Sequence, residues 1–197
     1  AIASQIDAAA ARLPVLVIDD HPIVLQGCRR VLEDSGVETI AEATTVVGGY
    51  RIFHRLRPPV VICDLTFQGS GMAGLGLIRR IRAVAPETRI LVFSMHNDPV
   101  IVARALEAGA LGYVLKDHAS AELFEAFGKV RVGEVYLDRR LATEVAMLRA
   151  DARRTPESQL TPREQQILAR LAQGRSYGAI AADLSVSYKT VTNACSQ

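Results

Sequence analysis

Short apolar runs alternate with helix-length segments along the first two thirds of the chain. Four runs are apolar throughout and a fifth is mixed; they lie at 15–18, 60–63, 90–93 and 111–115, and at 37–40. Such runs predict strands buried on both faces, with the mixed run at an edge. The intervening segments, which stop at glycine or proline and predict helices, lie at 22–35, 44–56, 75–85, 99–108 and 119–132. This alternation predicts a doubly wound, five-stranded parallel sheet with right-handed crossovers.

The composition is that of a globular protein. Of 197 residues, 49% are hydrophobic and 22% are charged. No apolar run approaches the ~20 residues of a membrane helix, and the first residues lack the basic start of a secretory signal. We therefore expect a cytoplasmic protein with no membrane partner. Cys28, Cys63 and Cys195 have no metal-binding spacing and are expected to be reduced, mostly buried thiols.

The strand pattern stops after Gly133, and the remainder predicts helices. Leu141, Val145 and Leu148 form a short helical stripe, and the polar stretch at 151–158 predicts a linker. We therefore divide the chain into four parts: an N-terminal extension (1–13), an α/β domain (14–134), a linker with a short helix (135–158) and a small all-α domain (159–197).

The last part has the pattern of a helix-turn-helix. Thr161 and Glu164 form a capping box, a second helix is predicted at 177–184, and a third begins at Tyr188 after the N-cap Ser187. Residues up to 134 carry a net charge of −1 and the remainder carries +3. A mildly basic C-terminal part is compatible with nucleic acid as a partner.

Charged and hydroxyl side chains follow the apolar strands. The first strand ends at Asp19 and Asp20, and three others end at Asp64, Ser94 and Lys116. Ligands of open parallel sheets bind beyond the carboxyl ends of the strands. Three carboxylates together favour a Mg²⁺ ion, and a lysine and a serine suit phosphoryl oxygens. Asp64 is then a candidate nucleophile that forms an acyl phosphate.

Individual residues also have ordinary structural interpretations. Asp20 lies just before the helix at 22–35 and would serve as its N-cap. Tyr113 would be an edge-strand tyrosine that covers a helix. Among the histidines, His21 and His96 are candidates to line the site.

Several segments together resemble the receiver domain of two-component response regulators. They are LVIDDH at 16–21, the Asp64 strand, SMH at 94–96 and AGALGYVLKD at 108–117. The segment LTPRE at 160–164, with IA at 180–181 and KTV at 189–191, resembles the LuxR-type helix-turn-helix. The pairing is similar to the NarL/FixJ subfamily. It implies a flavodoxin-like receiver followed by a DNA-binding domain, in a regulator that is not an enzyme.

The resemblance also implies a phosphoacceptor and a metal site. Asp64 would receive a phosphoryl group from a phosphohistidine of a sensor histidine kinase. Asp19 and Asp20 would hold Mg²⁺ together with Asp64 and the backbone carbonyl of Thr66. The phosphorylated protein is expected to form a homodimer.

Three further residues receive roles from the same resemblance. Lys116 would pair with the phosphoryl group and Ser94 would donate a hydrogen bond to it. Tyr113 would be the switch aromatic that turns inward as Ser94 moves.

The loop after Asp64 departs from the family. It lacks the usual Met-Pro-Gly and is longer, which bears on the lifetime of the phosphoryl group. It also contains Gly69, Gly71 and Gly74 in the spacing of a dinucleotide-binding fingerprint, which suggests an oxidoreductase. The first glycine, however, does not follow the strand directly, as that motif requires. A phosphatase with an aspartyl nucleophile is a closer alternative, but Thr66 stands where it needs a second aspartate.

The third helix of a helix-turn-helix enters the major groove, so its early residues are the candidate DNA contacts. They are Lys189, Thr192, Asn193 and Ser196. The sequence ends at Gln197, before a LuxR-type domain would be complete, and we expect the domain to be truncated. An output domain that makes only protein contacts is therefore an alternative.

One surface helix is strongly basic. Arg79, Arg80 and Arg82 are expected on the solvated face of the helix at 75–85, and that face is also available to a partner.

Overall fold

The computed structural model describes residues 13–117, 120–154, 162–184 and 186–194. The chain divides into two compact units between Ala146 and Met147, and each is described by itself.

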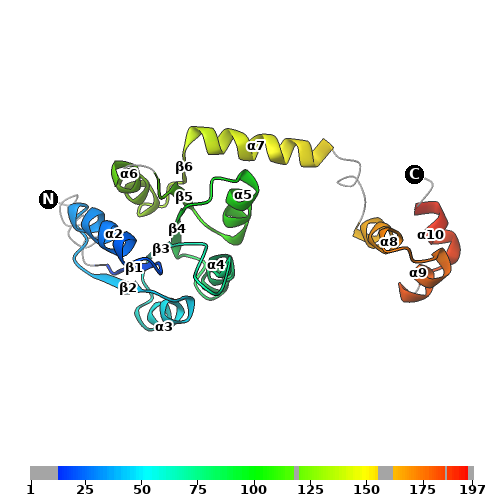
Figure 1. Ribbon diagram of the computed structural model, residues 1–197, viewed down its shortest axis with the longest axis horizontal. Helices are drawn as coiled ribbons and strands as arrows, with labels where there is room; N and C mark the ends of the chain where they lie inside the picture. The colour runs from blue at the N-terminus through cyan, green and yellow to red at the C-terminus, as the bar shows by residue number, and fades with distance from the viewer. Residues whose placement is uncertain (1–12, 118–119, 155–161, 185, 195–197) are drawn as a thin grey trace. The chain divides into compact units, whose positions relative to one another are not determined.

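The first unit is built on a six-stranded parallel sheet (Figure 1). The strands are β1 (Val15–Ile18), β2 (Ile40–Ala43), β3 (Val60–Cys63), β4 (Arg89–Ser94), β5 (Gly112–Leu115) and β6 (Tyr136–Leu137). Their spatial order is β2-β1-β3-β4-β5-β6, and neighbouring strands are parallel throughout. The chain reverses its direction of travel across the sheet between β1 and β3, which makes their carboxyl ends the expected place for a ligand.

Helices cover both faces of this sheet. On one face lie α2 (Pro22–Asp34) and α6 (Ser120–Val130); on the other lie α3 (Val46–Leu56), α4 (Ala73–Val84) and α5 (Pro99–Ala108). All four residues of β1 and of β3 are buried, which explains why these strands lack the polar alternation of a half-exposed sheet. Apolar residues of α2 and α6 pack with the sheet into one core cluster.

Three features of this unit differ from the sequence prediction. The edge strand lies at Ile40–Ala43 rather than at 37–40, because Val37 is buried in the turn after α2, where its N–H donates to Leu32 O. The sheet has six strands rather than five, because the short β6 pairs with β5. The helix predicted in the linker is α7 (Arg139–Arg154), which continues through part of the polar stretch.

The second unit contains α8 (Pro162–Ala172), α9 (Tyr177–Asp183) and α10 (Tyr188–Ala194). A small core holds the three helices together; its buried members are Ile167, Ile180, Ala181 and Val191. The N-cap predicted at Ser187 is confirmed, since its Oγ accepts a hydrogen bond from the N–H of Thr190. Thr161, of the predicted capping box, lies outside the described residues. No helix in the described ranges is long and apolar enough to cross a membrane.

Candidate functional site

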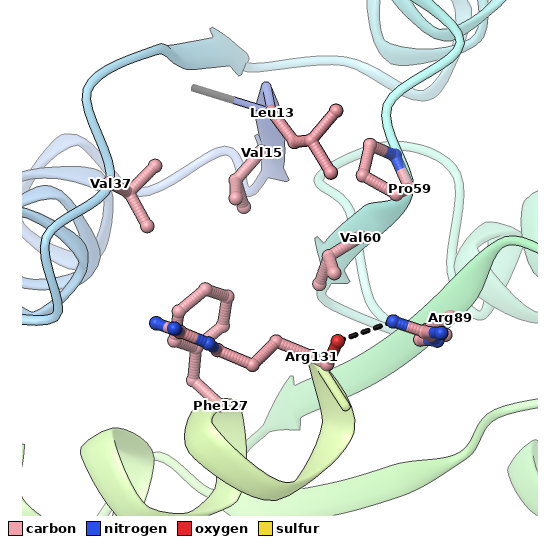
Figure 2. Close-up of a pocket in the computed structure, with 8 residues that line it drawn as sticks. All are labelled: Leu13, Val15, Val37, Pro59, Val60, Arg89, Phe127 and Arg131. Carbon is pink, nitrogen blue, oxygen red and sulfur yellow. Dashed lines mark hydrogen bonds between the residues drawn. The ribbon is translucent and has the colours of Figure 1, made fainter. Parts of the chain in front are cut away.

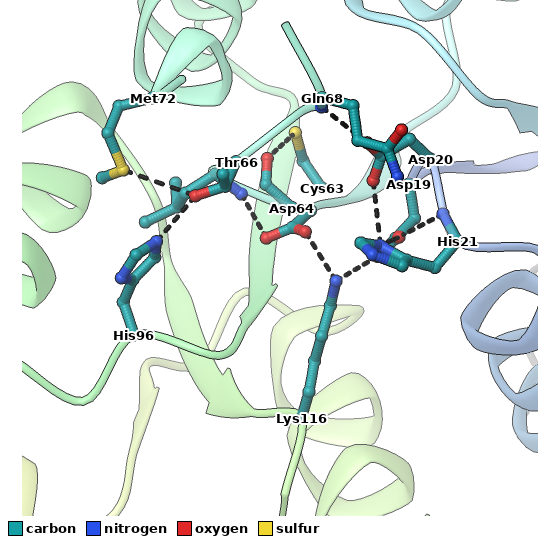
Figure 3. A network of polar contacts seen from close by, with 11 residues as sticks. Asp19, Asp20, His21, Cys63, Asp64, Thr66, Gln68, Met72, His96 and Lys116 are labelled. Atoms are coloured by element: carbon teal, nitrogen blue, oxygen red, sulfur yellow. Dashed lines mark hydrogen bonds and ion pairs between the residues drawn. The ribbon is translucent and has the colours of Figure 1, made fainter. Parts of the chain in front are cut away.

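The carboxyl ends of β1 and β3 bring three aspartates together (Figure 3). Ile18 and Cys63 are paired in the sheet, so the residues that follow them emerge side by side. The N–H of Asp64 donates to Ile18 O at 3.0 Å, which fixes the start of the second segment. Asp19, Asp20, Asp64 and His21 each place one possible ligand atom within 4.8 Å of the others. The aspartates predicted to converge therefore do converge.

Lys116 provides the positive charge of this cluster. Its Nζ lies 2.5 Å from Oδ2 of Asp64 and 2.6 Å from Oδ2 of Asp19. The side chains of all three residues are at most 5% exposed. Burial alone would lower the pKa of Lys116, but the hydrogen bonds and charges of the two aspartates outweigh burial, and its pKa is raised. The lysine therefore remains an ammonium group at neutral pH.

The other carboxylate oxygens differ in how fully they are engaged. Oδ1 of Asp64 accepts from the N–H of Leu65 at 2.6 Å, and Oδ1 of Asp19 accepts from the N–H of His21 at 2.9 Å. Oδ2 of Asp20 accepts from the N–H of Gln68 at 2.7 Å. Oδ1 of Asp20 is buried and accepts no hydrogen bond, although Nδ1 of His21 lies 2.9 Å away. This oxygen is available to a cation.

Asp20 is not the cap of the following helix. The N-cap of α2 is His21, and no side chain caps that helix end. The ordinary structural interpretation of Asp20 is therefore wrong, and its carboxylate belongs to the cluster.

A pocket of about 340 Å³ opens beside the cluster. It is lined by Asp20, His21, Asp64, Thr66, Phe67, Gln68, Ser94, Met95 and His96. Ser94 is fully buried and its Oγ has no hydrogen-bond partner. Oγ1 of Thr66 lies 2.6 Å from Nε2 of His96. The prediction that His21 and His96 line the site is confirmed, and the pocket supplies a buried hydroxyl that a bound group would satisfy.

Tyr113 points inward from β5. It is 0% exposed, and its hydroxyl donates to the backbone O of His96 at 2.7 Å. Burial raises the pKa of Tyr113 to about 12. The nearby Ser94 hydroxyl opposes this rise in pKa, and the negative charge of Asp64 adds to it. The interpretation of Tyr113 as an edge-strand residue is wrong, because β5 lies between β4 and β6.

The loop after Asp64 folds back on itself before α4 begins. The N–H of Phe67 donates to Gly71 O, and the N–H of Ser70 donates to Phe67 O. Gly69 and Gly71 have φ values of +72° and +52°, which favour glycine. Two of the three glycines of the apparent dinucleotide fingerprint therefore allow this turn to form. The turn does not follow directly from the end of β3, as a dinucleotide-binding turn would.

Gly74 is required for a different reason. A Cβ at this position would lie 2.2 Å from the backbone O of Asp64 and 2.6 Å from Cα of Leu65. The start of α4 thus packs directly against the backbone of the candidate phosphoacceptor, and a hydrogen bond from the N–H of Gly74 to Leu65 O reinforces the contact.

The opposite end of the sheet holds a different pocket (Figure 2). It has a volume of about 50 Å³ and is lined by Leu13, Val15, Val37, Pro59, Val60, Arg89, Phe127 and Arg131. Its lining contains arginines but no carboxylate. Within the described ranges, the acidic cluster that could hold a metal lies at the carboxyl ends of the strands.

The predicted DNA contacts of the second unit are placed in part. Lys189 is exposed near the start of α10, whereas Thr192 is partly buried and its hydroxyl donates to Lys189 O at 3.0 Å. Asn193 lies in α10, but its side chain is outside the described residues, as is all of Ser196. The sequence argument used Tyr188 only as the start of the third helix; its side chain is 58% exposed and contacts Tyr177 with ring centroids 6.2 Å apart.

Comparison with protein families assigns both units. Residues 15–128 match the response regulator receiver domain, and residues 158–196 match the bacterial regulatory proteins of the luxR family. The chain belongs to the response regulator family. This family comprises regulators rather than enzymes in general, and neither match supports the oxidoreductase hypothesis raised by the glycine spacing.

Named response regulators are similar to most of this chain. The response regulator is 40% identical to the methanol utilization control regulatory protein MoxX of Paracoccus denitrificans, over 93% of this chain and 82% of that protein. It is 34% identical to the nitrate/nitrite response regulator NarL of Escherichia coli, over 90% and 83%. It also resembles the structure of RcsB from Salmonella enterica serovar Typhimurium bound to promoter rprA, with a TM-score of 0.64, 28% identity and coverage of 94% and 89%.

Proposed function

We propose that Asp64 accepts a phosphoryl group from a sensor histidine kinase, and that this step controls transcription through DNA binding by the second unit. The observation that carries the proposal is that Asp64 and the buried Ser94 hydroxyl, which has no hydrogen-bond partner among the described residues, line one pocket, while the Lys116 ammonium group contacts Asp64. Few other chemistries use a carboxylate nucleophile, a buried cation and a spare donor together.

In the proposed reaction, a carboxylate oxygen of Asp64 attacks phosphorus of a kinase phosphohistidine. The P–N bond breaks, its electron pair remains on the imidazole nitrogen, and an acyl phosphate forms on Asp64. Lys116 offsets charge on the phosphoryl oxygens, and Ser94 donates a hydrogen bond to one of them. Tyr113 already points inward in this structure, so as the switch aromatic it would keep this buried position when Ser94 makes the bond.

The acidic cluster suits Mg²⁺, which prefers carboxylate and carbonyl oxygens. Asp20 supports this assignment most directly, because its buried Oδ1 lacks a hydrogen bond. Asp19, Asp64 and the backbone carbonyl of Thr66 would complete the protein ligands. The ion would neutralise charge on the phosphoryl oxygens during transfer.

For the second unit, we propose DNA contact through α10. The exposed Lys189 and the packing of α10 on α9 support this role, as does the DNA-bound RcsB structure. Thr192, Asn193 and Ser196 are the further candidates. Phosphorylation would favour a homodimer, whose two copies would read two half-sites.

Two measurements test the proposal. Incubation with Mg²⁺ and a small phosphodonor should produce an acid-labile phosphate on the protein. The variant Asp64→Asn should lack this phosphate. The control variant Asp34→Asn, which changes an exposed aspartate of α2, should retain it. An undiminished label in Asp64→Asn would exclude Asp64. In a titration with promoter DNA, Lys189→Ala should weaken binding by the phosphorylated protein. Phosphorylation without any DNA binding would instead favour an output domain that makes protein contacts.

A further inference from the structure

Basic residues of the receiver unit are concentrated on two neighbouring helices. The arginines of α3, its C-cap and α4 are Arg51, Arg55, Arg57, Arg79, Arg80 and Arg82, and these segments contain no acidic residue. Elsewhere in residues 1–134 there are eight basic and fifteen acidic residues, a net charge of −7. Although residues 1–134 are nearly neutral overall, their positive charges are therefore separated from most of their negative charges. We call the surface formed by the six arginines the basic face.

The arginines of the two helices belong to one continuous surface. The guanidinium group of Arg80 lies over the ring of Tyr50 in α3, 4.4 Å from its centroid. At the other end of the helices, Nη1 of Arg57 lies 3.5 Å from the backbone O of Val84 in α4. Figure 1 shows α3 and α4 next to each other on the same side of the sheet, in agreement with their packing.

Three members of the basic face lack a structural role. Arg51, Arg55 and Arg79 are exposed, and in the part of the chain that the structure describes they have no ion pair, hydrogen bond or ring contact. Two other cations of this unit are neutralised by acidic neighbours: Arg29 pairs with Glu42, and Lys129 pairs with Glu125. Exposed cations without an ion pair in the described ranges, such as Arg30 and Arg104, lie singly on the separate helices α2 and α5. Like charges on one surface repel, so an unneutralised group of arginines favours binding of a polyanion.

We propose that the basic face binds the phosphate backbone of DNA, as a contact separate from that of α10. The planar guanidinium group donates two parallel hydrogen bonds to phosphate oxygens, which suits arginine to this task. The inference rests on the proposed function, because the second unit would bring DNA to the same chain. Because the two units are tethered, DNA bound by the second unit raises the effective concentration of phosphate near the receiver unit. Even a low intrinsic affinity of the basic face for phosphate would then add to the overall affinity for DNA. The contact carries no base sequence information.

The test compares two full-length triple variants that remove the same number of positive charges. R51Q/R55Q/R79Q alters the basic face, whereas R30Q/K129Q/R139Q alters surface cations of α2, α6 and the start of α7. Affinity for labelled promoter DNA is measured over a series of salt concentrations. The slope of log K against log salt is negative, and each lost phosphate contact makes it shallower by ~0.9. We expect the slope of the first variant to be shallower by up to ~2.7 and its affinity at ~0.1 M salt to fall on the order of 10- to 100-fold. The second variant should match the wild type.

The outcomes separate this inference from the proposed function. If the wild-type chain binds no DNA, the proposed function fails. If it binds DNA and R51Q/R55Q/R79Q has an unchanged slope, the inference alone is overturned. Loss of self-association in sedimentation without a change in slope would mean that the face contacts another protein chain instead. The single variant Arg55→Gln should make the slope shallower by ~0.9, and normal phosphorylation at Asp64 verifies that each variant is folded.

Discussion

The ammonium group of Lys116 contacts the carboxylate of Asp64 at 2.5 Å, although their strands, β5 and β3, are separated in the sheet by β4. The same ammonium group contacts Asp19 at the end of β1. One buried side chain thus joins the ends of three strands. The lysine proposed to bind the phosphoryl group also holds two buried carboxylates in place before phosphorylation.

Replacing Lys116 should therefore destabilise the protein. Lys116→Met leaves two nearly buried carboxylates without their cation, a change that typically costs about 3–5 kcal/mol in free energy of unfolding. Urea unfolding without metal measures the loss. Lys129→Met, at an exposed pair, should cost at most about 1 kcal/mol. Adding Asp64→Asn to Lys116→Met should recover part of the stability, and equal losses in the single and double variants would contradict the pairing.

Asp20 should matter more to metal binding than to folding. Asp20→Ala removes the carboxylate whose buried Oδ1 accepts no hydrogen bond from any described residue and also relieves repulsion within the acidic cluster. We expect weaker Mg²⁺ binding in calorimetry, with the thermal midpoint of the metal-free protein unchanged or raised. Asp34→Ala provides the control for loss of one negative charge. Unaltered Mg²⁺ affinity in Asp20→Ala would remove Asp20 from the metal site.

Two glycines of α4 should respond in opposite ways to alanine. At Gly74 a Cβ would collide with the backbone of Asp64 and Leu65, so Gly74→Ala should destabilise the protein and slow phosphorylation. At Gly76 nothing lies within 4 Å of the added Cβ, so Gly76→Ala should stabilise by about 0.5–1 kcal/mol through helix propensity. Thermal unfolding and phosphorylation rates distinguish them. Equal behaviour of the two variants would show that the close approach at Gly74 is unimportant.

Tyr113 should make the protein sensitive to alkaline pH. Its pKa is raised from 10.0 to about 12 by burial, so the unfolded chain releases this proton before the folded protein does. The contribution of Tyr113 is therefore complete below pH 10 and decreases as the pH rises to about 12, by about 1.4 kcal/mol per pH unit. Denaturant unfolding of Tyr113→Phe should show a shallower decline over this interval, whereas the exposed Tyr188→Phe should follow the wild type.

The sequence predicted the central strands because burial on both faces leaves a continuous apolar run, as in β1 and β3. The edge strand β2 was misplaced because its residues are only partly covered, and Ala41 and Glu42 have little strand propensity. The two-residue β6 was too short to give a pattern. Only Leu141 and Val145 of α7 are buried among its described side chains, so the polar remainder gave no indication that the helix continued.

The candidate site was predictable to the extent that strand ends converge. The positions of Asp19, Asp20, Asp64 and Lys116 followed from the topology alone. The contact between Thr66 and His96 did not, because it joins two loops whose conformations depend on packing rather than on periodicity. The continuity of the basic face across α3 and α4 likewise required knowledge of which helices are neighbours.

The hydrogen bond from the Gln68 amide to Asp20 links the loop after Asp64 to the proposed metal site. The acceptor is Oδ2 of Asp20, whereas we assign Oδ1 of the same carboxylate to the metal. A cation on Oδ1 would withdraw electron density from Oδ2 and so weaken a backbone hydrogen bond four residues from the proposed phosphoacceptor. Amide exchange at Gln68 would then act as an intrinsic reporter of what occupies Asp20. The hydrogen bonds of the turn between Phe67 and Gly71 restrict any resulting motion to a few residues. The change in amide exchange would therefore be confined to this turn and could be measured without an added label.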